Sequence, residues 1–227
     1  MTLLGLTKYT KTILSPMTHI RNLLGNTGFA VANGHYRVGK AVPALKTLAT
    51  DTPQSRAAYG RLLELGIVGD GVHAGEFRDV VNGVLGERDI TAGESMNRVS
   101  DKRIAGWVRK GGKLAEKLYH AEDAVWKTYA FENEKARYQK AFPEWSEEQL
   151  DRHAAEIIHN TYPTYSMISR GLRAMRRVPL VGPFIAFPAE VARTAFHTMN
   201  YVKKELADPK TRRIGAERLA GIALAAS

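Results

Sequence analysis

The chain contains no cysteine, which excludes a fold held by disulfide bonds and excludes thiolate metal sites. It also lacks an apolar run near the roughly 20 residues that a membrane-spanning helix needs. The longest apolar stretch, residues 178–189, is interrupted by Gly182 and three prolines. Thr, Pro, His and Arg break the first apolar residues, so we expect no signal peptide. The stability of this chain of 227 residues, 44% of them apolar, must come from packing.

Acidic residues are missing from the first 50 positions, which hold six Lys or Arg. Residues 51–162 hold sixteen basic and nineteen acidic residues, and residues 163–227 hold eleven and four. The net charge of +10 therefore comes from the two ends of the chain. Such a layout indicates two basic regions that meet phosphate, of nucleic acid or of lipid headgroups, on either side of a near-neutral spacer.

The alternating pattern of β-strands is lacking too, whereas apolar residues recur at helical spacing almost throughout. The sequence therefore predicts an all-α fold, a multi-helix bundle with one long central helix over residues 101–142. Two regions are expected: residues 1–100, which include a glycine-rich hinge at 66–100, and residues 101–227, which hold the long helix and a C-terminal helical region.

Capping and stop signals divide these regions further. Further helices are expected at 3–14, 16–33, 53–65, 76–85, 147–159 and 166–177, from Pro188 onward, and after Pro209. The signals at helix starts are Thr52-Pro53, a capping box at 91–94, Ser146 with Gln149, and Asp208-Pro209. The signals at helix ends are Asn33-Gly34 and Pro143.

The two last helices have unusual apolar patterns. The helix after Pro188 carries one apolar stripe, made by Ala192, Ala195, Phe196, Met199, Val202 and Leu206. The final helix places its large apolar residues, Ile214, Leu219, Ile222 and Leu224, among Ala and Gly. No polar segment follows it, so we expect the sequence to be a fragment of a larger polypeptide.

Basic residues near the C-terminal end are the candidates for binding a polyanion. Arg170, Arg173 and Arg177 project from one side of a predicted helix, and guanidinium groups match phosphate oxygens well. The full predicted set is Arg170, Arg173, Arg176, Arg177, Lys210, Arg212 and Arg213. The alternative is a solvated helix face that pairs with acids of residues 122–156.

The apolar stretch 178–187 lies next to those arginines and predicts a contact with a membrane or a partner. An apolar loop flanked by cations is typical of proteins that insert at a membrane boundary. Phe184, Ile185 and Phe187 are the residues expected to make that contact. The alternative is a buried connector between helices, because several large apolar side chains exposed together favour aggregation.

No catalytic or metal-binding pattern is present, so we expect no enzyme and no cofactor. His153 and His159 are six residues apart and do not form a helical metal pair. There is no glycine-rich phosphate loop and no nucleophile elbow. The acids of the long helix are expected to keep it soluble, with Asp123 pairing Lys127; these acids are Glu122, Asp123, Glu132 and Glu134.

Three stretches, Thr12–Asn22, Glu122–Glu134 and Pro179–Glu190, together resemble a segment of the large internal virion proteins of tailed bacteriophages, which are ejected with the genome. The resemblance covers nearly the whole chain, although those proteins are far longer. It implies a helical segment that packs inside the capsid or helps to form a conduit through the host envelope. The implied partners are other virion subunits, a homo-oligomer, DNA and an anionic membrane surface. The implied locations are the virion and then the host cell envelope or cytoplasm.

The leading hypothesis is therefore a non-enzymatic virion module for genome packaging or ejection, which binds partner subunits and DNA or an anionic membrane. One alternative is an accessory domain of a virion-associated enzyme polyprotein, polymerase or lysozyme-like, whose acids at 122–156 would line a cleft. Another is a plain packing domain whose charge balances an acidic neighbour.

Overall fold

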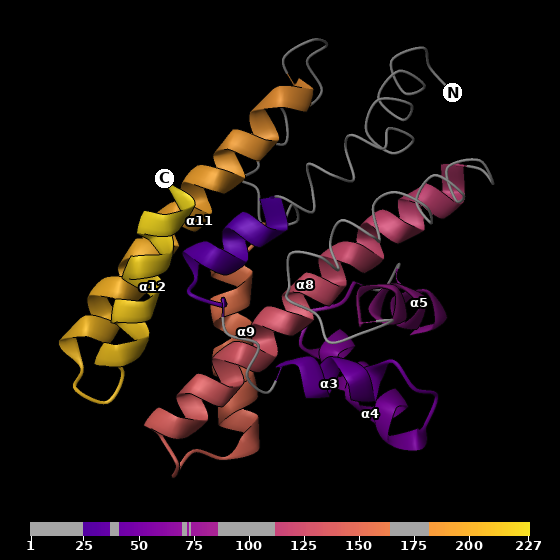
Figure 1. The fold of residues 1–227 in the computed structure, drawn as a ribbon, viewed down its shortest axis with the longest axis horizontal. Helices are drawn as coiled ribbons and strands as arrows, with labels where there is room; N and C mark the ends of the chain where they lie inside the picture. The colour runs from indigo at the N-terminus through magenta and orange to yellow at the C-terminus, as the bar shows by residue number, and fades with distance from the viewer. Residues whose placement is uncertain (1–24, 37–40, 70–71, 73, 86–111, 164–181) are drawn as a thin grey trace. The chain divides into compact units, whose positions relative to one another are not determined.

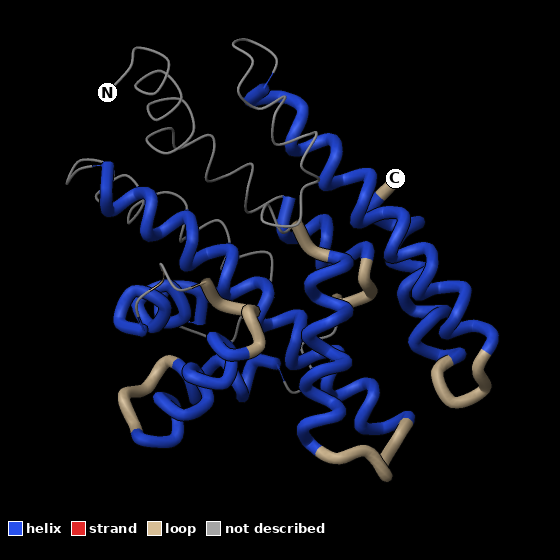
Figure 2. The backbone as a smooth tube through the Cα atoms, turned by 180° about the vertical axis from the view of Figure 1, so that it is seen from behind, coloured by secondary structure: helices blue, strands red, loops and turns tan. Residues whose placement is uncertain are grey.

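The computed structural model describes residues 25–36, 41–69, 72, 74–85, 112–163 and 182–227, with only the backbone described at 76, 79–80, 83–85, 112–120 and 182–187. Every regular element in these ranges is a helix (Figure 2), which confirms the all-α fold. The helices labelled in Figure 1 are α3 (Ala41–Leu48), α4 (Pro53–Glu64), α5 (Ala74–Leu85), α8 (Gly112–Ala141), α9 (Glu147–Thr161), α11 (Gly182–Ala207) and α12 (Arg212–Ala225). A short helix also spans residues 25–32.

The chain forms two compact units that do not follow the order of the sequence. The second unit combines the segment Gly28–Arg37 with Glu134–Ser227, and the first unit holds the other residues up to Asn133. Helix α8 therefore begins in the first unit and ends in the second. The boundary that the sequence suggested, at residue 100, lies outside the described residues.

In the first unit, α3 packs against both α4 and α5. Helix α4 begins as predicted, because Thr52 Oγ1 accepts a hydrogen bond of 3.1 Å from the N–H of Ser55 and Pro53 takes the first helical position. The rings of Tyr59 and Phe77 meet edge to face at 5.4 Å, and the Tyr59 hydroxyl donates to the carbonyl of Val72. These contacts hold α4, α5 and the turn between them around one small core.

In the second unit, apolar side chains of four helices form a core: Tyr138, Leu150, Ile157, Tyr201 and Ile214. The predicted capping box begins α9, where Ser146 Oγ accepts from the N–H of Gln149 and Gln149 Oε1 accepts from the N–H of Ser146. Helix α8 ends just before Pro143, as expected. The turn between them stacks Phe142 on Trp145 at 4.4 Å and closes one end of the core.

The predicted start of α11 is wrong. Residues 182–187 were expected in a connector, but their backbone is helical, and Pro188 lies inside the helix instead of starting it. The sequence holds an earlier start signal, because Pro183 is in the first turn, where the missing N–H has no helical partner. The helix then continues through Pro188 with the loss of one backbone hydrogen bond.

The predicted cap of the last helix is wrong as well. Helix α12 begins at Arg212 after Thr211, which makes no side-chain capping bond. The Asp208 carboxylate accepts from the N–H of Lys210 at 2.9 Å, two residues further on. Asp208 therefore stabilises the turn between α11 and α12, because a side chain that bonds its own backbone two residues later favours a turn.

Helices α11 and α12 run antiparallel and side by side, as both views show (Figures 1 and 2). Gly215 permits the close approach near their turn, since a Cβ there would lie 2.9 Å from the nitrogen of Leu206. We call this pair the α11–α12 hairpin. Helix α11 also packs against α9, so the hairpin is fixed to the rest of the second unit.

Candidate functional site: a buried charge network and a basic turn

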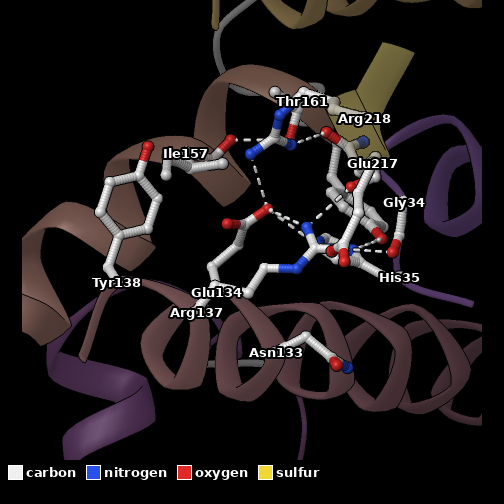
Figure 3. A network of polar contacts seen from close by, with 12 residues as sticks. Gly34, His35, Asn133, Glu134, Arg137, Tyr138, Ile157, Thr161, Glu217 and Arg218 are labelled. Carbon is white, nitrogen blue, oxygen red and sulfur yellow. Dashed lines mark hydrogen bonds and ion pairs between the residues drawn. The ribbon is translucent and has the colours of Figure 1, made fainter. Parts of the chain in front are cut away.

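An arginine without solvent exposure lies at the centre of the second unit. Arg218 of α12 donates from Nε and Nη2 to the two carboxylate oxygens of Glu205, at 3.0 and 2.8 Å. Its Nη2 also donates to Glu134 Oε1 at 2.9 Å, and its Nη1 donates to Asn33 Oδ1 at 2.6 Å. Figure 3 shows Glu134 and Arg218 facing each other from different helices. One guanidinium thus joins α8, α11, α12 and the segment 28–37.

His35 extends this network. Its Nε2 lies 2.7 Å from Glu134 Oε1, and its Nδ1 lies 3.0 Å from the hydroxyl of Tyr162. Because a carboxylate only accepts hydrogen bonds, Nε2 carries the proton and Nδ1 accepts from Tyr162. Burial lowers the pKa of His35 to about 4, although Glu134 opposes this change. The imidazole is therefore neutral near pH 7.

The carboxylates of the network and the guanidinium of Arg218 stabilise each other's charged form. Burial alone would raise the pKa of Glu134, but the charge of Arg218 and the hydrogen bond from His35 outweigh it and lower that pKa. The carboxylates of Glu134 and Glu205 likewise raise the pKa of Arg218 against the effect of burial. Both Glu134 and Arg218 therefore stay charged inside the core, which is tolerated only for a paired and hydrogen-bonded ion.

Tyr138 completes the network on the other side of Glu205. Its hydroxyl donates to Glu205 Oε1 at 2.9 Å. Burial and the two nearby carboxylates raise the pKa of Tyr138, so the phenol keeps its proton. We define the buried charge network as Asn33, His35, Glu134, Tyr138, Tyr162, Glu205 and Arg218.

A glycine turn brings the segment 28–37 into this network. Gly34 has a φ of 72°, its N–H bonds the carbonyl of Val31, and the N–H of His35 bonds that of Ala30. This is a Schellman cap, so the predicted stop at Asn33-Gly34 is confirmed. Arg137 donates to the backbone carbonyls of Asn33 (2.9 Å) and Gly34, as Figure 3 shows for Gly34. The cap thereby fixes the direction in which His35 enters the core.

The interpretation of the long helix's acids as solubilising is wrong for Glu122 and Glu134, which are 7% and 0% exposed. The predicted pair of Asp123 with Lys127 is confirmed, at 2.6 Å. A signal for the burial of Glu134 was present in the sequence, since it lies four residues after Ala130 and four before Tyr138, on one helix face. Nothing local in the sequence points to Arg218 or His35 as its partners.

The basic residues predicted near the end of the chain lie at the turn of the α11–α12 hairpin. Lys210, Arg212 and Arg213 are all exposed. Lys210 pairs with Glu144 at 2.8 Å, Arg213 pairs with Glu217 at 3.2 Å, and Arg212 donates to the carbonyl of Leu206. Surface pairs of this kind are weak and easily exchanged for another anion.

Two further exposed lysines, Lys203 and Lys204, lie on the last turns of α11 and were not predicted as part of this set. They join the set because α11 and α12 are antiparallel, which brings the end of α11 beside the start of α12. We define the basic turn as Lys203, Lys204, Lys210, Arg212 and Arg213. The acids nearby are Asp208 within the turn and Glu144 and Glu217, which pair with Lys210 and Arg213, so the five cations remain in excess.

The other predicted site residues are not described in full. Arg170, Arg173, Arg176 and Arg177 lie outside the described residues. Phe184, Ile185 and Phe187 belong to the part of α11 of which only the backbone is described. Their side chains therefore enter no argument below.

Within the described ranges, no three His, Asp or Glu side chains gather in a way that could hold a metal ion. No described helix is long and apolar enough to span a membrane. His35 and Glu134 have the contact of an acid–base pair, but both side chains are 0% exposed, so a substrate does not reach them. Comparison of the chain with protein-family models, with curated proteins and with solved structures found no match.

Proposed function

We propose that this chain is a non-enzymatic helical module that binds a phosphate-bearing partner through the basic turn. The main observation in support is the cluster of exposed cations at one end of the α11–α12 hairpin. The hairpin belongs to a unit whose helices are joined by the buried charge network. Clustered guanidinium and ammonium groups attract phosphates of either nucleic acid or lipid. The resemblance to internal virion proteins supplies the setting, which is the packaging or delivery of a phage genome.

The rigid support of the turn favours this function. Arg218 lies six residues after Arg212, less than two turns along α12. It is hydrogen-bonded to both Glu205 and Glu134, so the start of α12 keeps its position relative to α11. Cations that are held in place lose less conformational entropy on binding than cations on a mobile tail. No observation in the described residues favours the enzyme alternative to the same degree.

The test is binding of the full chain to double-stranded DNA and to anionic vesicles over a salt series. We expect binding at low salt that weakens steeply as salt increases. Replacing Lys203, Arg212 and Arg213 with Glu should make the negative slope of log affinity against log salt for DNA shallower by about 3, since each phosphate contact contributes about 0.9. The control with the same change in charge is the reversal of the exposed Lys46, Arg56 and Arg152 to Glu. Absence of binding to both partners at low salt, or equal loss in the control, contradicts the proposal.

A further inference from the structure

Along residues 190–199, helix α11 has polar residues inside and apolar residues outside, whereas further along the helix Tyr201 and Val202 are buried and Lys203 and Lys204 are exposed. The residues that face the core include Glu190, Thr194, Thr198 and Glu205, each at most 4% exposed. The residues that face solvent include Val191 at 38%, Phe196 at 65% and Met199 at 40%. A helix of a globular protein normally has the opposite arrangement. Four of the six residues in the apolar stripe expected from sequence, at 192, 195, 196 and 199, are therefore on the outside.

Helix α12 repeats the arrangement. Arg218 is fully buried, whereas Leu219 is 45% and Leu224 is 61% exposed. Both neighbouring helices of the hairpin therefore expose large apolar side chains, and such exposure on one element is a feature of interaction surfaces. We define the outward apolar surface as Val191, Phe196, Met199, Leu219 and Leu224.

The outward apolar surface runs toward the basic turn on both helices. On α11, Lys203 follows Met199 by four residues and thus continues the same exposed line. On α12, Arg212 precedes Leu219 by seven residues, two helical turns, on the same exposed side. Because the helices are antiparallel (Figure 1), the segments that carry the cations of both lie at the turn end of the hairpin, and the outward apolar surface lies further from the turn.

This order of charge and apolar surface fits one partner best. DNA offers phosphates to the basic turn but no hydrocarbon to Phe196 and Met199. A second copy of the chain offers apolar surface but brings its own basic turn, and the chain already carries a net charge of +10. An anionic membrane presents phosphates at its surface and hydrocarbon just beneath, which complements both features at once.

We infer that the α11–α12 hairpin is a membrane-docking element, which binds anionic lipid headgroups with the basic turn and inserts Phe196, Met199, Leu219 and Leu224 at the hydrocarbon boundary. The inference rests on the proposed function and specifies the phosphate-bearing partner. Since no described helix can span a bilayer, the hairpin lies in the interface and does not cross it.

The test uses the absence of cysteine from the chain. A single cysteine introduced by Phe196→Cys is labelled with an environment-sensitive fluorophore, and the full chain is mixed with phosphatidylcholine vesicles with or without 30% phosphatidylserine. We expect a blue shift and protection from an aqueous quencher with the anionic vesicles only. The matched control is Arg152→Cys, at an exposed position of α9 in the same unit, which should remain accessible to the quencher.

A second pair of variants separates insertion from attraction by charge. Phe196→Gln with Met199→Gln should lower affinity for the anionic vesicles at least tenfold and leave DNA binding unchanged. Tyr36→Ser, which removes a large apolar group that is 43% exposed elsewhere in the unit, should change neither. Because all three side chains are exposed, these variants should fold normally, which circular dichroism checks.

Three outcomes overturn the inference. One is vesicle binding by the Gln double variant equal to that of the unchanged chain, and another is a label at position 196 that stays in water. The third is that light scattering shows the unchanged chain to be a dimer, that the Gln double variant is a monomer, and that the unchanged chain does not bind vesicles. In each case, binding of DNA that depends on the basic turn would leave the proposed function standing. If charge reversal in the basic turn weakens neither DNA binding nor vesicle binding, the proposed function itself is refuted.

Discussion

Arg218 of α12 and Glu134 of α8 form an ion pair of 2.9 Å in which neither side chain is exposed. The pair is part of a set of hydrogen bonds in which Glu205 takes two of the guanidinium's donors and Asn33 a third. Desolvating a charge is expensive, and it is offset here by the ion pairs and hydrogen bonds of Arg218, although Glu134 Oε2 is buried without a hydrogen-bond partner. The second unit thus holds a buried polar network beside its apolar core.

Replacing Arg218 with Met should destabilise the protein strongly. The substitution leaves the carboxylates of Glu134 and Glu205 buried without their cation, which costs about 3–5 kcal/mol of unfolding free energy. Urea unfolding followed by circular dichroism measures this change. Arg213→Met, on the exposed side of the same helix, should cost less than about 1 kcal/mol. Similar losses for the two variants would show that the buried charge network contributes little.

Acidification should destabilise the second unit over a defined range of pH. The folded pKa of His35, about 4, is below its ordinary value of 6.5, so the unfolded chain takes up a proton first as the pH falls. The contribution of His35 is complete above pH 6.5 and is lost as the pH falls from 6.5 to 4, by about 3 kcal/mol. His153, whose pKa is also lowered by burial, acts in the same direction.

The variant His35→Gln separates these groups. The Gln amide can still donate to Glu134 but does not titrate, so the loss of stability between pH 6.5 and 4 should become smaller. The pKa of Glu134 is lowered, and its contribution, present above pH 4.5, should still disappear at lower pH. Unfolding free energies measured by urea at pH 7, 5.5 and 4 provide the comparison. An unchanged pH profile in the variant would contradict the assignment to His35.

Gly221→Ala should destabilise the packing of α12 on the segment 28–37. A Cβ at this position would lie 2.0 Å from the carbonyl oxygen of Val31, so one backbone must shift. We expect a loss of about 1–3 kcal/mol, the usual cost of overpacking. Gly60→Ala in α4, where a Cβ meets nothing within 4 Å, should instead stabilise by up to about 1 kcal/mol. Thermal unfolding of both variants checks the contrast, and a neutral Gly221→Ala would disprove the close approach.

Arg193→Met should loosen the end of α9. Arg193 of α11 donates to the backbone carbonyls of His159, Asn160 and Tyr162 and is paired with Glu190 at 2.9 Å. It thereby supplies donors and positive charge to carbonyls that the helix leaves without partners. We expect a loss of about 1–3 kcal/mol, together with faster amide hydrogen exchange in the last turn of α9. If exchange there is unchanged, the end of α9 is held by other contacts.

Helix boundaries were predictable where a local signal decides them. Thr52 and Ser146 start helices because their side chains bond a nearby N–H, and Gly34 ends one because it accepts a positive φ. The prediction failed at Pro188 and Asp208, where two local signals compete and the tertiary structure selects one of them. Periodicity also identified the apolar stripe of α11, but it cannot indicate whether such a stripe faces the core or solvent.

Apart from the apolar helix face that carries Glu134, the buried charge network was not predictable from local pattern. Glu134 and Arg218 are surrounded by ordinary helix-forming residues, and a charged residue on a helix is usually solvated. Their burial follows from the pairing of segments that are 84 positions apart in the chain, which no short window of sequence contains. The basic turn was predicted only in part for the same reason, since Lys203 and Lys204 join it through the antiparallel hairpin.

The bond between Asn33 and Arg218 connects positions separated by 185 residues. During synthesis on the ribosome, Asn33 emerges long before Arg218 exists, so Asn33 cannot make this contact until the 185 residues that follow it have been made. Contacts of such long range slow folding, because the loop between them must close first. The Schellman turn at Gly34 reduces this difficulty, since it can form locally and keep His35 and Asn33 in a docking-competent shape. We therefore expect α12 to insert only after the segment around Gly34 has formed its turn.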